Sequence, residues 1–256
     1  MSARRSSAVA IGNFFFRYRN GAFPAVFAVT VLTLRPAVLF GNPSADRLLI
    51  RLGILVAIAG GLIRLLTIGY DYIDRGGKNK QVYASRLVHG GVYGITRNPM
   101  YVGNLLIAIG MTMVTGAPLA YLLIIPLFLC IYLTIIAAEE AYLRQRFGRD
   151  YEAYCAQVNR FLPAVRRIPQ SFSGLRYDWR RAIRKDLGTI TGLLLGLILF
   201  PVWRIYFLQG FHAAKHEARG ALLAAVGVLF GYWFLHALKK RGRFFYTTLD
   251  TPSTSR

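Results

Sequence analysis

Six long apolar stretches dominate the sequence and restrict its fold more than any other feature. A bilayer core of about 30 Å is crossed by about 20 helical residues, and each stretch reaches or nearly reaches that length. Hydrophobic residues make up 55% of the 256-residue chain, which is more than a soluble domain with such runs would carry. We therefore expect an all-α polytopic integral membrane bundle of about six transmembrane helices. The stretches cover residues 22–40, 48–70, 100–116, 118–138, 187–208 and 220–238.

Positive charge is distributed unevenly among the connections. The chain carries 32 Lys and Arg against 11 Asp and Glu, a formal charge of +21. The N-terminal segment, the 71–97 loop, residues 144–185 and the tail after residue 238 are basic, whereas residues 42–46, 115–118 and 209–217 carry little positive charge. Because cytoplasmic loops hold the excess of Lys and Arg, both termini are expected in the cytoplasm, with the chain in a cell inner membrane. The charge favours anionic lipid headgroups as partners over nucleic acid.

Glycines recur every fourth residue in the last two apolar stretches. They are Gly188, Gly192 and Gly196 in the first and Gly227 and Gly231 in the second. Small residues at this spacing let membrane helices approach closely. We expect these two helices to pack as a pair, and the same glycines make a homo-oligomer a further expectation.

A polar, glycine-rich loop leads directly into the third apolar stretch, with the sequence GGVYGITRNPMYVG over residues 90–103. Asn98 suits a helix N-cap and Pro99 suits the first helical position, so the pair can simply start a helix, with Arg97 reaching to the interface. The same geometry also presents free backbone N–H groups and a positive dipole end, which would bind a carboxylate. Spacing alone favours the structural interpretation.

Two adjacent carboxylates, Glu139 and Glu140, follow the fourth apolar stretch. Such pairs commonly do no more than end a membrane span. At a cytoplasmic helix C-terminus, however, both the helix dipole and the charge bias favour Lys or Arg. We therefore expect a cation to offset the pair, whether a sulfonium, an ammonium or a nearby arginine, and acidic groups at this depth are candidates for function.

Apolar residues continue at intervals of three and four after the acidic pair. They alternate with arginines and predict an amphipathic helix that is broken at Gly148 and lies on the membrane surface. These apolar residues are Leu143, Phe147, Tyr151, Tyr154 and Val158.

The pairing of GVYGITRNPMYVG with EEAYLRQRFGRDYEAY and then NRFLP resembles the isoprenylcysteine carboxyl methyltransferase and phospholipid methyltransferase superfamily of integral membrane enzymes. The resemblance spans roughly residues 48–169. It implies S-adenosylmethionine as cofactor, held at the cytoplasmic face by the loop, the Asn-Pro element and the Glu pair, and a lipid-like substrate that enters from the bilayer. Carried over by position, it implicates Tyr93, Arg97, Asn98, Tyr101, Glu139, Glu140 and Arg160.

The resemblance places Tyr93 and Arg97 among the cofactor-binding residues with the others. Asn98 and Tyr101, together with the helix start, would hold the methionine part of the cofactor. Glu139 or Glu140 would hold its ammonium group or its ribose hydroxyls.

The expected catalytic residues are Glu140, Arg97 and Arg160. The two arginines would orient an anionic group of the substrate, and Glu140 would act as a base if the acceptor is an amine. A carboxylate or phosphate oxygen as acceptor would need no base. Methyl transfer needs no metal, and none is expected, since His212 and His216 stand four residues apart without a third ligand.

Two other functions remain open. Membrane steroid and sterol reductases share an Arg-x-Pro-x-Tyr element but use NADPH, and here Met100 before Tyr101 and Gly103-Asn104 after it favour methyl transfer. A non-catalytic membrane protein is the third possibility, against which the Glu pair argues. Asn98 stands where many prenylcysteine-type members carry His. With Asn at this position, the Asn-Pro-Met-Tyr sequence is more similar to the phospholipid N-methyltransferase branch.

The chain divides into three expected parts. Residues 1–46 hold the first helix, residues 47–168 the methyltransferase core, and residues 169–256 a C-terminal hairpin and tail whose role the sequence does not indicate. Arg64 lies inside the second apolar stretch. We expect its side chain to extend to the interface, with contact to a lipid phosphate as the alternative.

Overall fold

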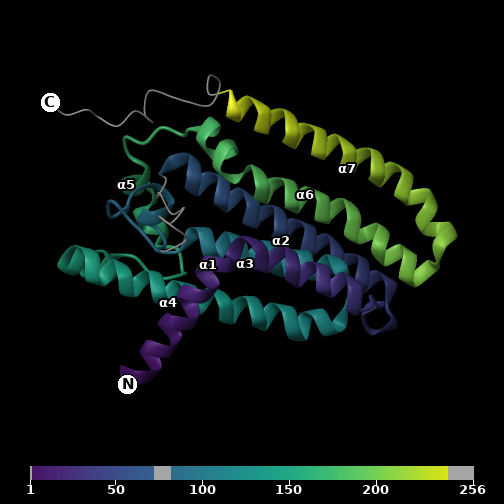
Figure 1. Cartoon of the computed structure of the whole chain (residues 1–256), viewed down its shortest axis with the longest axis horizontal. Helices are drawn as coiled ribbons and strands as arrows, with labels where there is room; N and C mark the ends of the chain where they lie inside the picture. The colour runs from purple at the N-terminus through teal and green to yellow at the C-terminus, as the bar shows by residue number, and fades with distance from the viewer. Residues whose placement is uncertain (1, 72–81, 242–256) are drawn as a thin grey trace.

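The structure is a computed structural model that describes residues 2–71 and 82–241, and this part contains helices and no strands (Figure 1). The predicted tail beyond residue 241 lies outside the described residues. The long helices are α1 (Ser2–Thr33), α2 (Pro43–Tyr70), α3 (Pro99–Thr115), α4 (Pro118–Gln157), α6 (Trp179–Gln209) and α7 (Phe211–Lys240). The short ones are α5 (Ile168–Phe172) and the 3-10 turns η1 (Leu39–Gly41), η3 (Gly91–Gly94) and η4 (Val165–Arg167). The all-α prediction is confirmed.

Four helices of the described part are long and apolar enough to cross a membrane, namely α2, α4, α6 and α7. The helix α3 is shorter, and the apolar part of α1 covers only Pro24–Thr33. The first span was expected to reach residue 40, and this bound is wrong because α1 ends at Thr33. Pro36 explains the early stop, because a proline lacks the N–H that a helix needs and disfavours helical geometry in the residue before it.

The helices α2 and α3 pack with their backbones almost in contact, and glycines make this possible. A Cβ atom added at Gly60 would lie 2.6 Å from the carbonyl oxygen of Gly103. One added at Gly53 would lie 2.8 Å from the carbonyl oxygen of Gly110. Small residues thus fix the distance between these two helices of the predicted methyltransferase core.

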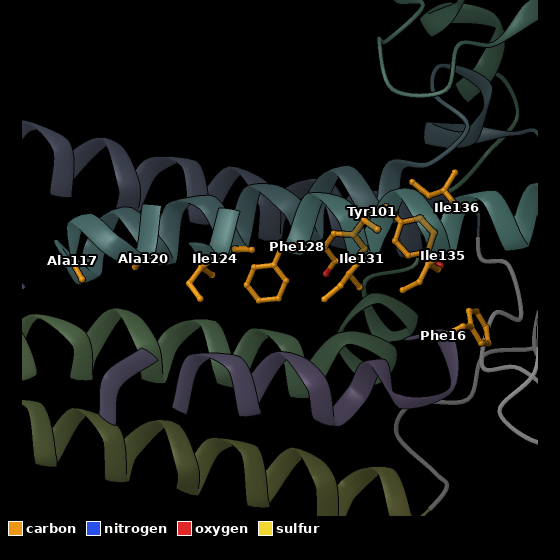
Figure 2. Close-up of a cluster of buried hydrophobic side chains, with 11 residues drawn as sticks. Phe16, Tyr101, Ala117, Ala120, Ile124, Phe128, Ile131, Ile135 and Ile136 are labelled. Atoms are coloured by element: carbon orange, nitrogen blue, oxygen red, sulfur yellow. The ribbon is translucent and has the colours of Figure 1, made fainter. Parts of the chain in front are cut away.

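The hydrophobic core lies where α4 packs against α1. Figure 2 shows Ile124, Phe128 and Ile131 extending from α4 toward the α1 ribbon. The ring of Phe27 on α1 lies 5.5 Å from that of Phe128, centroid to centroid. The N-terminal helix therefore covers the helix that carries the acidic pair.

The last two helices pack against each other, as predicted, but their glycines do not form the contact. Cβ atoms added at Gly188, Gly192, Gly227 or Gly231 would meet nothing within 4 Å in the described structure. The predicted connection over residues 209–217 is also wrong, because Gly210 alone separates α6 from α7. His212 therefore lies in the first turn of α7.

Two buried ion pairs hold α6 against α2. Asp46 near the start of α2 pairs with Arg204, and Arg64 near its end pairs with Asp186. The expectation that Arg64 extends to the interface is thus wrong. Its guanidinium pairs with the Asp186 carboxylate inside the bundle. The arginine therefore does not have to extend to water, and its charge is not left buried and unpaired.

Candidate active site

A partly open cavity lies at the end of the bundle where α3 begins. Its walls come from α1, from the segment before η3, from the start of α3 and from α4. Its lining combines apolar and aromatic side chains with the charged residues of the predicted motifs. The lining residues are Phe16, Val82, Tyr83, Ala84, Arg86, Leu87, Val88, Tyr93, Arg97, Asn98, Glu139, Glu140, Leu143, Tyr151 and Tyr154.

The acidic pair lies within α4 and not at its end, which corrects the prediction. The helix continues past Glu140 to a kink at Gly148, where the backbone is non-helical with φ 49° and ψ −119°. The predicted break at Gly148 is confirmed. The argument from the helix dipole fails, because that field is strong only in the last turn. Burial is what makes the pair unusual, since Glu139 and Glu140 are 4% and 2% exposed.

Three arginines surround the carboxylate of Glu140. Arg160 binds it with two hydrogen bonds, one of them from Nε to Oε1 at 3.0 Å. An Arg97 nitrogen lies 3.6 Å from Oε1, and Arg144, one turn along α4, lies 3.9 Å from Oε2. The cation expected for the acidic pair is thus supplied by the protein itself.

Glu139 has a different environment from its neighbour. Tyr101 on α3 donates a hydrogen bond from its hydroxyl to Glu139 Oε1, and both side chains are buried. The ring of Tyr101 lies 5.5 Å from that of Tyr132 on α4. This contact joins α3 to α4 at the cavity wall.

The NRFLP segment runs beside the TRNP segment that begins α3. Arg97 N–H donates to the carbonyl of Asn159 at 2.9 Å, and Ala164 N–H donates to that of Ile95 at 2.8 Å. The amide of Asn98 donates to the carbonyl of Arg160 at 3.3 Å. The prediction that the Asn98 side chain caps α3 is therefore wrong, whereas the prediction that Pro99 begins the helix is confirmed. Its side chain ties two motifs together instead.

Tyr93 lies in the η3 turn, almost fully buried, and its carbonyl accepts a hydrogen bond from the Tyr154 hydroxyl at 2.7 Å. Gly91 in the same turn has φ +56°, which a side chain would strain. The turn and the kinked part of α4 thus form one wall. Tyr151, on the apolar face of this amphipathic part, is 1% exposed and lines the cavity, and the location of this part on the membrane surface stays a prediction.

The comparisons with known proteins agree with this geometry. Residues 48–150 match the family model of phospholipid methyltransferases. A probable protein-S-isoprenylcysteine O-methyltransferase of Oryza sativa subsp. indica is 30% identical over 118 residues, which is 44% of this chain and 60% of the relative. These matches are to members of the isoprenylcysteine carboxyl methyltransferase and phospholipid methyltransferase superfamily, and each covers less than half of this chain.

Other matches cover smaller parts of the chain. A protein-S-isoprenylcysteine O-methyltransferase of Schizosaccharomyces pombe is 35% identical over 79 residues, 31% of this chain and 34% of the relative. A probable 7-dehydrocholesterol reductase of Acanthamoeba polyphaga mimivirus is 26% identical over 88 residues, 32% of this chain and 19% of the relative. No solved structure shows a significant match. The match to the family model ends at residue 150, before the NRFLP segment and the α6–α7 hairpin.

The residues that line the cavity fit the groups that S-adenosylmethionine carries. The Nε of Arg97 is buried and has no hydrogen-bond partner within the described residues, so it is a free donor beside the cavity. Glu139 offers a carboxylate to a cation, and Asn98 offers an amide. Burial, followed by the charge of Glu140, raises the pKa of Tyr151, so its phenol stays protonated.

The sequence did not indicate every residue of the cavity. The Val82–Val88 segment and Phe16 were missed individually, although the superfamily resemblance implied that the loop before the Asn-Pro element covers the cofactor. Arg144 was assigned only to a basic face. Its spacing of four residues from Glu140 on a helix was the signal for an ion pair.

Replacing Tyr154 by Phe should lower the stability of the protein by about 1 kcal/mol, because the Tyr93 carbonyl loses its hydrogen bond. We expect the melting temperature to fall by roughly 2–4 °C. The measurement is thermal unfolding in detergent. Tyr142→Phe is the matched control, since no hydrogen bond of its hydroxyl is found in the described structure. Equal melting curves for the two variants would contradict the prediction.

Proposed function

We propose that this protein is an S-adenosylmethionine-dependent methyltransferase that acts on a membrane lipid or lipid-like amphiphile at the cytoplasmic leaflet. The observation that carries the proposal is a single cavity that joins the buried Glu pair on α4 to the Asn-Pro start of α3. We further propose a cell inner membrane location with both termini in the cytoplasm. In support, α1 begins and α7 ends at the end of the bundle that holds α5 (Figure 1).

The cofactor would supply a methyl group on a positively charged sulfur. Glu139 is the carboxylate better placed for its ammonium or hydroxyl groups, because Glu140 is already bound by arginines. Asn98 and the start of α3 would hold its carboxylate, with Tyr101 orienting Glu139. The buried aromatic ring of Tyr93 would contact the adenine part.

Glu140, Arg97 and Arg160 are the proposed catalytic group. Arg97 has a free buried donor and would orient an anionic group of the acceptor. Arg160 is bound to Glu140, so its role would be to hold that carboxylate and the NRFLP segment in place. The three-arginine environment supports a carboxylate or phosphate acceptor, since Glu140 could serve as a base for an amine only after releasing Arg160.

The acceptor would be amphiphilic. The cavity is lined by apolar side chains, among them Phe16, Leu87 and Leu143, as well as by charged residues. An apolar chain could therefore lie against the apolar side chains while its headgroup lies at the charged ones. The matched phospholipid methyltransferase family and the similarity to an isoprenylcysteine O-methyltransferase are consistent with such a molecule.

Ligand-induced stabilisation of the purified protein tests the proposal. We expect S-adenosylhomocysteine at 100 times its Kd to stabilise the protein by about 2.7 kcal/mol and NADPH to leave it unchanged. The reductase match makes the opposite result the specific alternative. Stabilisation by NADPH alone would overturn the proposal. Membranes given methyl-labelled S-adenosylmethionine should then show label in one lipid fraction, which identifies the acceptor.

A further inference from the structure

A buried ion pair connects the region that matches the family model to the hairpin outside it. Arg64 Nε on α2 lies 3.0 Å from Asp186 Oδ2 on α6, and a second Arg64 nitrogen binds Asp186 Oδ1. Their side chains are 10% and 1% exposed. The Arg64 Nη2 also donates to Thr189 Oγ1 at 3.2 Å. Removing two charges from water costs free energy that the pair does not always repay, so its presence calls for a reason beyond stability.

The same guanidinium reaches α3. Arg64 Nη1 donates to the side-chain oxygen of Asn104. To get there it crosses Gly103, where an added Cβ would lie 2.6 Å from Arg64 Cγ. The glycine that ends the GVYGITRNPMYVG motif thus leaves the space through which this arginine passes.

Asn104 lies one turn after Tyr101 on α3, so their positions are rigidly linked. Tyr101 donates to Glu139 at the cavity wall. The first turns of α3 are therefore held from two directions, by Glu139 of α4 and by Arg64 of α2. Asp186 in turn sets the direction of the Arg64 guanidinium.

We propose that Asp186 and Arg64 are positioning residues for the methyl-transfer site. Asp186, supplied by the hairpin, orients Arg64, which fixes the start of α3 through Asn104 and so places the Tyr101–Glu139 contact. This inference rests on the proposed function for its effect on cofactor binding. The effect on α3 itself does not depend on that function.

The test compares two variants that each break one buried ion pair between the same two helices. Asp186→Asn breaks the pair beside α3, and Asp46→Asn breaks the pair with Arg204, about 27 Å away along α2. The Asp46–Arg204 pair is a close match for the Asp186–Arg64 pair in burial. Its side chains are 6% and 11% exposed, against 1% and 10% for Asp186 and Arg64. Both variants should melt at lower temperature than the unaltered protein.

Only Asp186→Asn should weaken the binding of S-adenosylhomocysteine, by about tenfold in Kd. It should also speed amide hydrogen exchange over residues 99–104, which Asp46→Asn should not. Equal effects of both variants on Kd and on exchange would overturn the proposal and reduce the pair to a structural role. If the unaltered protein binds no S-adenosylhomocysteine, the proposed function fails, and the exchange measurement still decides the positioning role.

A double variant covers the case in which Asp186→Asn does not fold. Replacing Arg64 by Met and Asp186 by Leu removes both charges, which often restores stability, but it also removes the link to Asn104. We expect a melting temperature near that of the unaltered protein together with faster exchange over residues 99–104. Exchange at the unaltered rate in a stable double variant would overturn the proposal.

Discussion

The variant Glu140→Gln should lose methyl transfer by about a hundredfold or more in kcat/KM. Glutamine keeps the shape of the side chain but removes the charge that Arg97, Arg144 and Arg160 share. A positioned group that stabilises the developing charge of a transition state is worth about 10²–10³ in rate, and we take the lower value because the Arg160 side chain is 42% exposed. The measurement is transfer of labelled methyl groups to membrane lipid.

Glu152→Gln is the matched control for this change. Glu152 also binds an arginine, with 2.9 Å between Arg144 Nε and Glu152 Oε1, but its side chain is 59% exposed. Exposed pairs contribute about 0–1 kcal/mol, so this variant should keep nearly full activity. A folded Glu140→Gln protein with activity equal to that of the control would remove Glu140 from the proposed catalytic group.

The positions of the motif residues were predictable because they depend on short-range patterns. An apolar stretch, a glycine-rich loop and a proline place the start of α3, and a second stretch ends near the acidic pair. A hairpin with a tight turn at Gly116 brings these ends together, so Asn98 and Glu139 line one cavity.

The partners of the motif residues were harder to predict, since they are far away in the sequence. The charge of Glu140 indicated a cation, but its partner Arg160 lies 20 residues later, after a kink. Arg64 gave no sign of its partner Asp186, which is 122 residues away on another helix. An isolated arginine in an apolar stretch looks the same whether it extends to the interface or meets a carboxylate.

Glycine spacing was misleading for a related reason. The regular series on α6 and α7 matched the small-residue pattern, yet four of its five glycines have open space around them, and the fifth, Gly196, lies against the Met111 side chain of α3 and not against the partner helix. The glycines that do allow close packing, Gly53 and Gly60 on α2 with Gly103 and Gly110 on α3, are seven residues apart on each helix. A spacing of seven residues is two helical turns, so each pair faces one partner helix. A glycine series in one helix therefore indicates a close helix contact only when the helix packed against it carries glycines at a matching spacing.

The variant Gly60→Val should therefore destabilise the protein strongly, by about 3 kcal/mol, the upper end of the range for overpacking. The new Cβ would lie 2.6 Å from the Gly103 carbonyl oxygen and 2.8 Å from the Ile107 backbone nitrogen. Backbone atoms cannot move aside as a flexible side chain can, so α2 and α3 must separate. Because Gly60 lies four residues before Arg64, the separation should also loosen the start of α3. Thermal unfolding in detergent, with the monodisperse fraction after purification, measures the effect.

Gly192→Val on α6 separates the two interpretations of the glycines. Its added Cβ meets nothing within 4 Å in the described structure, so we expect a change within about 0.5 kcal/mol, as at ordinary surface positions. If the regular glycine series on α6 formed the close helix contact instead, Gly192→Val would be the damaging variant and Gly60→Val the harmless one. That reversed order would contradict both the packing of α2 on α3 and the role given to Gly103 as the passage for Arg64.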